Sequence, residues 1–123
     1  MNRTVQRPVD YSRRVELDTV TGNSTVTVTK DGGAWHAPDV DLACDAFAVE
    51  RASITADDPL SARYEVTATH RLARGDWRVS AETRSVLTAT SGAFQVQLDL
   101  DAYEGDTRFF SKSWTLSVPR DHL

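Results

Sequence analysis

Hydrophobic and polar residues alternate along most of this 123-residue chain, with a period of two. Such a period places successive side chains on opposite faces of an extended strand, whereas a helix requires a period near 3.6. Thr and Val, which favour strands, are abundant throughout. The pattern predicts an all-β fold and indicates no helix.

The C-terminal half shows the alternation most clearly and predicts four long strands. Short segments around Gly75, Gly92 and Gly105 separate them, and glycine supplies the positive φ that a tight reversal needs. Four such strands in succession predict an antiparallel meander. The predicted strands are 62–72, 77–89, 93–103 and about 107–118.

Two places depart from strict alternation in this half. The adjacent pair Val86 and Leu87 indicates either a bulge or a stretch covered on both faces. Lys112 interrupts the apolar face of the last strand, where it could mark a bulge or an inward charge that protects an edge strand from pairing. Leu98 and Trp114 are in phase with their apolar neighbours, and we expect both to be buried.

The N-terminal half predicts shorter strands. Segments 13–18 and 23–30 form a predicted hairpin with Val26 and Val28 facing the core. Asp31-Gly32-Gly33 is then expected to turn the chain into a short strand at 34–36, which Pro38 ends. A further strand at 47–54 is closed by a turn at Asp57-Asp58-Pro59. We expect residues 1–12 to form an N-terminal arm and residues 13–123 a single β-sandwich domain.

Composition and charge describe an ordinary globular domain, with 40% hydrophobic residues, 26% charged residues and a net charge of -4. The single cysteine, Cys44, excludes an intramolecular disulfide and is expected to act as a small buried hydrophobe. No cluster of basic residues predicts binding to nucleic acid or to anionic lipid. No apolar run follows the basic residues of 1–14, so we expect a cytoplasmic protein without a membrane partner.

Motifs for catalysis or metal binding are missing from the sequence. The nearest approach to a serine nucleophile elbow, at 22–26, lacks the second glycine and is better explained as a hairpin turn. His36, His70 and His122 lie far apart, without the spacing of metal ligands. Segment 99–106 departs from a calcium-binding loop, because its fifth residue is tyrosine and its glycine is seventh. We therefore expect no catalytic residue, no cofactor and no metal site.

Three tryptophans could form a platform for carbohydrate or bases. Trp77 and Trp114 are in phase with apolar residues of their strands and are predicted to be core residues. Trp35 lies in the least regular segment and is the best candidate for an exposed contact.

Four motifs in the C-terminal half resemble, in the same order, one known family. They are Asp57-Asp58-Pro59-Leu60-Ser61-Ala62; Arg74-Gly75-Asp76-Trp77-Arg78-Val79 with Glu82-Thr83-Arg84; Leu100-Asp101-Ala102-Tyr103-Glu104-Gly105-Asp106; and Trp114 to Pro119-Arg120-Asp121. The chain thus resembles the non-catalytic C-terminal domain of the X-Pro dipeptidyl-peptidase and cocaine esterase (CocE/NonD) class of serine hydrolases. The likeness extends more weakly back to about Arg13.

The resemblance implies a β-sandwich of jelly-roll type that packs against an α/β-hydrolase domain carrying a Ser-Asp-His triad. The catalytic domain and the front part of the family's C-terminal domain have no counterpart in this sequence. No triad residue can therefore be assigned here, and neither His70 nor His122 is a substitute. We expect a non-catalytic accessory or interaction domain; the alternative is a stand-alone sandwich that binds a small ligand or carbohydrate.

The missing front strands also predict how the chain associates. A truncated sandwich exposes either an unpaired strand edge or an apolar sheet face, and such surfaces bind partners. We expect a symmetric homodimer, with a separate hydrolase subunit as the alternative partner.

Overall fold

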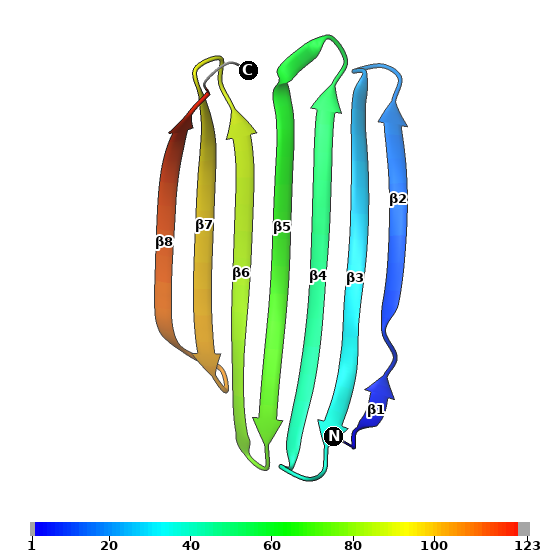
Figure 1. Cartoon of the computed structure of the whole chain (residues 1–123), viewed down its shortest axis with the longest axis vertical. Helices are drawn as coiled ribbons and strands as arrows, with labels where there is room; N and C mark the ends of the chain where they lie inside the picture. Colours follow the sequence, from blue (N-terminus) through cyan, green and yellow to red (C-terminus); the bar gives the residue numbers. More distant parts are fainter. Residues whose placement is uncertain (1, 121–123) are drawn as a thin grey trace.

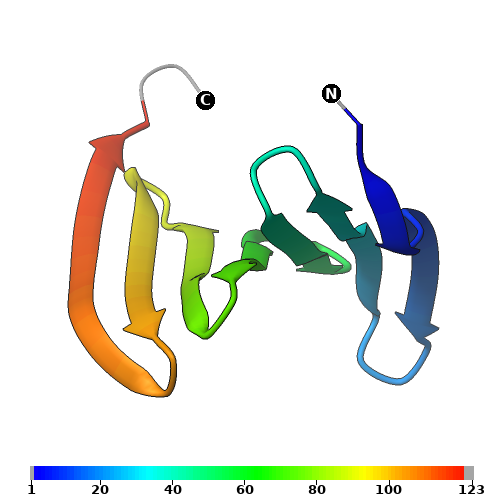
Figure 2. The same cartoon turned by 90° about the horizontal axis from the view of Figure 1, so that it is seen from below.

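A computed structural model describes residues 2–120, which form one antiparallel sheet of eight strands and no helix (Figures 1 and 2). This confirms the predicted all-β class. The strands are β1 (Thr4–Arg7), β2 (Asp10–Asp18), β3 (Asn23–Ala37), β4 (Leu42–Thr55), β5 (Asp58–Arg74), β6 (Trp77–Ala89), β7 (Ala93–Glu104) and β8 (Thr107–Pro119).

The order of the strands across the sheet follows the sequence. From β3 to β8 each strand pairs with the next, while β1 and β2 both pair with the outer side of β3. The sheet is thus seven positions wide, with β5 in the middle, β8 at one edge and the β1–β2 pair at the other. Short connections are possible because every pairing is antiparallel.

The strands of the C-terminal half lie where the alternation predicts them. Connections of two residues follow β5 and β7, and each begins with a glycine at φ +57°, Gly75 and Gly105. The possible bulge at Val86 is not formed, because β6 stays in register with both neighbours there. Lys112 is also in register, opposite Leu100, and the irregularity of β8 falls earlier, beside Tyr103.

The predicted turn at Asp31-Gly32-Gly33 is wrong. These residues form a β-bulge inside β3, which continues from Asn23 to Ala37 and ends just before Pro38. The N–H of Gly33 donates a hydrogen bond to Asp31 Oδ1 at 2.8 Å, and Gly33 has φ +82°. The sequence Asp-Gly-Gly is compatible with a bulge as well as with a reversal. Because β4 continues opposite these residues, the bulge is formed.

Residues 4–7 and 10–12, which the sequence assigns to an arm outside the domain, are strands of the sheet. Val5 lies opposite Trp35 and Tyr11 opposite Lys30. Between the two strands, Pro8 and Val9 leave a short gap in the pairing. Elsewhere, the predicted turn at Asp57-Asp58-Pro59 is displaced, because β5 already includes Asp58.

The sheet forms a single layer, and no second sheet packs on it within residues 2–120 (Figure 2). The two layers of the expected sandwich are therefore not present in this part of the chain. Ala37, at 4% exposed, is the one buried hydrophobic residue of the described range. The expected burial of Leu98 and Trp114 is wrong for the isolated chain: they face each other but are half-buried, and Trp77 is exposed.

Glycine substitutions test the bulge in β3. An alanine Cβ at position 33 would lie 2.7 Å from the carbonyl oxygen of Arg7, in addition to the cost of positive φ. We expect Gly33→Ala to lower the free energy of unfolding by roughly 2 to 4 kcal/mol. Gly75→Ala should cost about 1 kcal/mol, because its φ is positive but nothing lies near the added atom. Gly92→Ala, in open space, is the control. Urea unfolding measures the series, and equal effects at all three positions would contradict the bulge.

Candidate interaction surface

One face of the sheet is apolar across nearly its whole width. Directly opposite residues of neighbouring strands share a face, as do alternate residues of one strand, so the pairing assigns every position to a face. We call this surface the apolar face. Its central residues are Val15, Val26, Val28, Ala48, Ala52, Tyr64, Val66, Ala68, Leu87, Val96, Leu98, Leu100, Trp114 and Leu116.

These side chains are exposed or half-buried in the isolated chain, and none of them is buried. Leu116 is 50% exposed and Val118 49%, and Tyr64 and Leu87 are also exposed. The chain exposes 8517 Å² in all, whereas a compact monomer of 13.6 kDa would expose about 6,600 Å². A sheet whose hydrophobic face is uncovered loses most of the free energy that normally stabilises such a fold.

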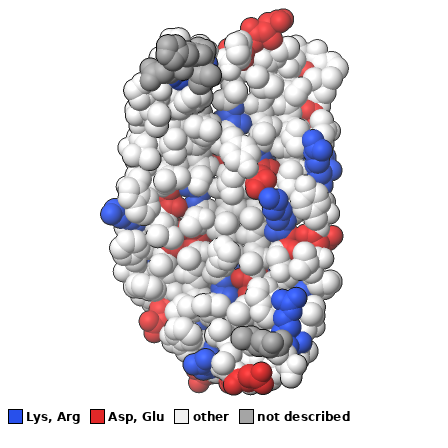
Figure 3. All heavy atoms as spheres, viewed as in Figure 1, with Lys and Arg blue, Asp and Glu red and all other residues white. Residues whose placement is uncertain are grey.

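Charges on the apolar face are few, and the central pair is internally satisfied. Lys30 Nζ donates a hydrogen bond to Glu50 Oε1 at 2.9 Å, which raises the pKa of Lys30 above its ordinary value. Arg13 and Lys112 lie on the outer strands β2 and β8. Figure 3 shows the face turned to the viewer in Figure 1, and uncharged residues cover most of it.

A hollow of about 380 Å³ lies at the end of the apolar face where β4 meets β5. The side chains of Ile54, Tyr64, Leu87 and Phe94 are among those that line it. The lining is almost wholly apolar, so it suits a hydrocarbon or aromatic group better than a sugar, which requires several hydrogen-bond partners.

The opposite face, which we call the polar face, carries most of the charge and is organised around Glu65. Arg84 and Arg63 donate hydrogen bonds to Glu65 Oε2 at 2.7 Å and 3.0 Å, and Arg51 lies 3.9 Å from Oε1. Partial burial acts to raise the pKa of Glu65, but the hydrogen bonds from Arg63 and Arg84 outweigh it and hold the pKa below its ordinary value. This side therefore has the ion pairs and hydrogen bonds of a solvated face.

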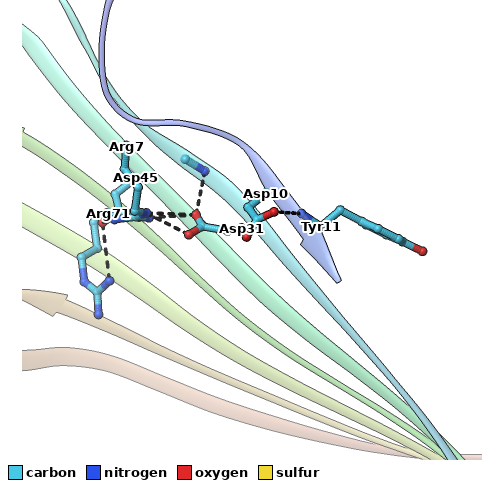
Figure 4. Close-up of polar contacts among 7 residues, drawn as sticks. Arg7, Asp10, Tyr11, Asp31, Asp45 and Arg71 are labelled. Atoms are coloured by element: carbon cyan, nitrogen blue, oxygen red, sulfur yellow. Dashed lines mark hydrogen bonds and ion pairs between the residues drawn. The ribbon is translucent and has the colours of Figure 1, made fainter. Parts of the chain in front are cut away.

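A second ion-pair cluster on the polar face ties β1 to the sheet (Figure 4). Arg7 Nε donates to Asp31 Oδ2 at 2.9 Å, and Arg7 Nη2 donates to Asp45 Oδ1 at 2.6 Å. Arg71, on β5, lies 3.8 Å from Asp45. The hydrogen bonds from Arg7 and from the Gly33 amide lower the pKa of Asp31. One arginine thus holds the short edge strand against β3 and β4.

Both edges of the sheet carry features that oppose pairing with another sheet. At the β1–β2 edge, the pairing with β3 is interrupted at Pro8, which has no N–H to donate. At the β8 edge, Lys112 lies on the apolar face with its ammonium 5.0 Å from the centre of the Trp114 ring. An inward-facing lysine and a bulge are known protections of edge strands. Lys112 thus lies in register on the apolar face of the edge strand β8, as the inward-charge interpretation expects, and its protective role stays a prediction.

Trp35, the candidate exposed contact, lies in regular strand structure on the apolar face. It is opposite Val5 and Cys44, is half-buried, and has the Arg3 guanidinium 5.6 Å from its ring centre. Cys44 is a free, half-buried thiol. The sequence names Trp35 alone, whereas the structure places it at one end of a much larger apolar surface.

The histidines are not brought together. His36 contacts Asp41 at 2.8 Å, His70 lies on the apolar face opposite Ala46 and Ala81, and His122 is outside the described residues. Within residues 2–120 no group of three or more His, Cys, Asp or Glu side chains could hold a metal ion. The described residues also contain no helix long and apolar enough to span a membrane.

Comparisons with known proteins identify no relative of this chain. No family model matches the chain, and no curated protein or solved structure matches it either.

Acidification tests the Glu65 cluster. Because the pKa of Glu65 is lower in the folded chain than its unfolded value of about 4.3, its ion pairs stabilise the fold above that pH and are lost as the pH falls through the folded pKa. We expect Glu65→Gln to reduce the free energy of unfolding at pH 7 by roughly 1 to 2 kcal/mol. The difference in the free energy of unfolding between Glu65→Gln and the natural sequence should decrease steadily below about pH 4.

The matched control is Glu16→Gln, since Glu16 pairs with Arg14 at 2.8 Å while both side chains are mostly exposed. It should change stability little at any pH. Chemical denaturation between pH 3 and 7 gives the comparison. A Glu65→Gln effect that does not vary with pH would contradict the electrostatic explanation.

Proposed function

We propose that this chain is a non-catalytic interaction domain that supplies one layer of a β-sandwich. The uncovered apolar face carries the proposal, because a sheet with one apolar and one polar face is stable in water when another layer covers the apolar side. In the family that the sequence resembles, the C-terminal domain is itself a β-sandwich that packs against the hydrolase domain. The proposed partner is therefore a hydrolase subunit or a second copy of the chain.

The proposal assigns no catalytic residue. A hydroxyl or thiol nucleophile needs an adjacent base to be reactive at neutral pH. The hydrogen bond that His36 makes within residues 2–120 goes to Asp41, and Cys44 lies between Trp35 and Leu72. We accordingly propose a role in binding or assembly rather than in catalysis, in the cytoplasm and without nucleic acid or membrane as partner.

A second candidate function is binding of a small apolar ligand, favoured by the hollow between Ile54, Tyr64 and Phe94. Pockets for small molecules are typically apolar and of this size. In the first proposal, side chains of the covering layer fill the same hollow. The two functions differ in whether association of protein chains or a small molecule covers these residues.

Two neighbouring residues of β6 test the first proposal. Leu87 is exposed on the apolar face, and Thr88 points to the polar face. We expect Leu87→Asn to weaken association by at least about 10-fold, and Thr88→Asn to leave it unchanged, because only the first adds a polar group to the buried interface. Sedimentation velocity would measure association of the chain with itself and with a hydrolase of the resembled family that lacks its own C-terminal domain.

Association with either partner that depends on Leu87 would support the proposal. A chain that stays monomeric and binds no hydrolase would contradict it, as would association that is lost equally in both variants.

A further inference from the structure

We propose that the occupant of the apolar face is a second copy of this chain, so that two sheets pack face to face into a symmetric sandwich. This inference rests on the proposed function and names its partner. Three observations favour it: the chemistry of the face, its area, and the protection of both edges.

The chemistry of the face matches the chemistry of a second copy. Glu50, the acidic group nearest the centre, is already paired with Lys30 within one chain, so a covering surface need not supply a compensating charge. Apart from this pair, the rows through Val66 and Ala68 carry aliphatic or aromatic side chains except at Ser85 and Thr83 on β6 and at the two cations of the outer strands, Arg13 and Lys112. A largely apolar face needs an apolar surface of similar width to cover it. In an isologous interface the same face of the second chain provides that surface.

The area of the face is large enough for a stable dimer. It extends over seven strand positions and, along β5, over five alternate residues from Ala62 to His70. With strands about 4.8 Å apart and alternate residues about 6.8 Å apart, it covers about 1,000 Å² per chain. Two chains together would bury about 2,000 Å², which is at the upper end of standard interfaces and at the start of the range for obligate homodimers.

The edges favour this arrangement over continuation of the sheet. Lys112 at the β8 edge and Pro8 at the other edge oppose strand addition. Edge pairing would also leave the apolar face of both copies in water. Face-to-face packing, with the strands of the two sheets within about 30° of each other, covers that face and leaves the protected edges free.

Symmetry places one residue beside its own copy. If both faces are fully covered, the two-fold axis passes close to the middle of the face, which is the centre of β5. The middle of the range 62–70 is Val66, and Ala68 is the next residue of β5 on the apolar face, opposite Ala48 and Thr83. A two-fold axis between two facing sheets lies in the plane of the interface, and with this axis along β5 the side chain at position 68 of each chain lies beside its copy.

Charge substitutions at this position provide the test. Ala68→Asp and Ala68→Lys should each weaken dimerisation at least about 100-fold, because like charges would be buried together. An equal mixture of the two variants should form a heterodimer with an affinity within about 10-fold of the natural homodimer. Thr67→Asp and Thr67→Lys, on the polar face of the same strand, are the controls and should dimerise normally.

Sedimentation equilibrium measures the mass in each case, 13.6 kDa for the monomer and twice that for the dimer. Far-UV circular dichroism verifies that each variant is folded. If an Ala68 variant does not fold, Leu98→Asn and Gln97→Asn decide instead, with at least about a 10-fold loss of affinity for the first and none for the second.

Dimerisation of the natural chain, together with restored association when the Ala68→Asp and Ala68→Lys variants are mixed, would support the inference. Failure of two folded Ala68 variants to associate on mixing would overturn it, as would a natural chain that remains a monomer at about 100 μM, far above the Kd of a standard interface. A monomeric chain that still binds a hydrolase through Leu87 would overturn the homodimer while leaving the proposed function intact.

Discussion

Exclusion of water from the apolar face is the constraint on which the rest of this structure depends. Between its two edges, the sheet satisfies its backbone hydrogen bonds internally. Burial of apolar side chains, however, supplies most of the free energy that offsets the entropy of ordering the chain. Here that burial cannot occur within one layer, as the exposure of Tyr64, Leu87 and Leu116 shows. The second layer that we propose would supply this burial, so the apolar face bears on both the stability and the proposed function of the chain.

The other features of the sheet restrict how that layer can be added. Ion pairs around Glu65 and Arg7 make the polar face stable in contact with water. The bulge at Gly33 keeps Asp31 within reach of Arg7, so that the short strand β1 stays attached. Pro8 and Lys112 oppose association through the edges. Together these features favour the apolar face as the proposed surface of association.

Local pattern was sufficient to predict the four strands of the C-terminal half, because alternation of apolar and polar residues directly reflects a sheet with two different faces. It was insufficient at Asp31-Gly32-Gly33, where the same residues suit a turn or a bulge, and the choice depends on β4 lying opposite. The role of Arg7 was missed for a similar reason, since its partners Asp31 and Asp45 are distant in sequence. Trp35 was identified singly because sequence alone does not show that Leu98, Tyr64 and Val26 lie on the same face. Whether that face is covered depends on a second layer, which no local pattern encodes.

The most direct measurement of the central claim is the solvent accessibility of methyl groups on the two faces, by NMR with a soluble paramagnetic agent. Val66 and Leu98 lie on the apolar face, whereas Val49 and Val86 lie on the polar face of β4 and β6. The account predicts that the signals of Val66 and Leu98 are broadened much less than those of Val49 and Val86 when the chain is associated. Stronger broadening of Val66 and Leu98 under those conditions would show an uncovered apolar face and contradict the account.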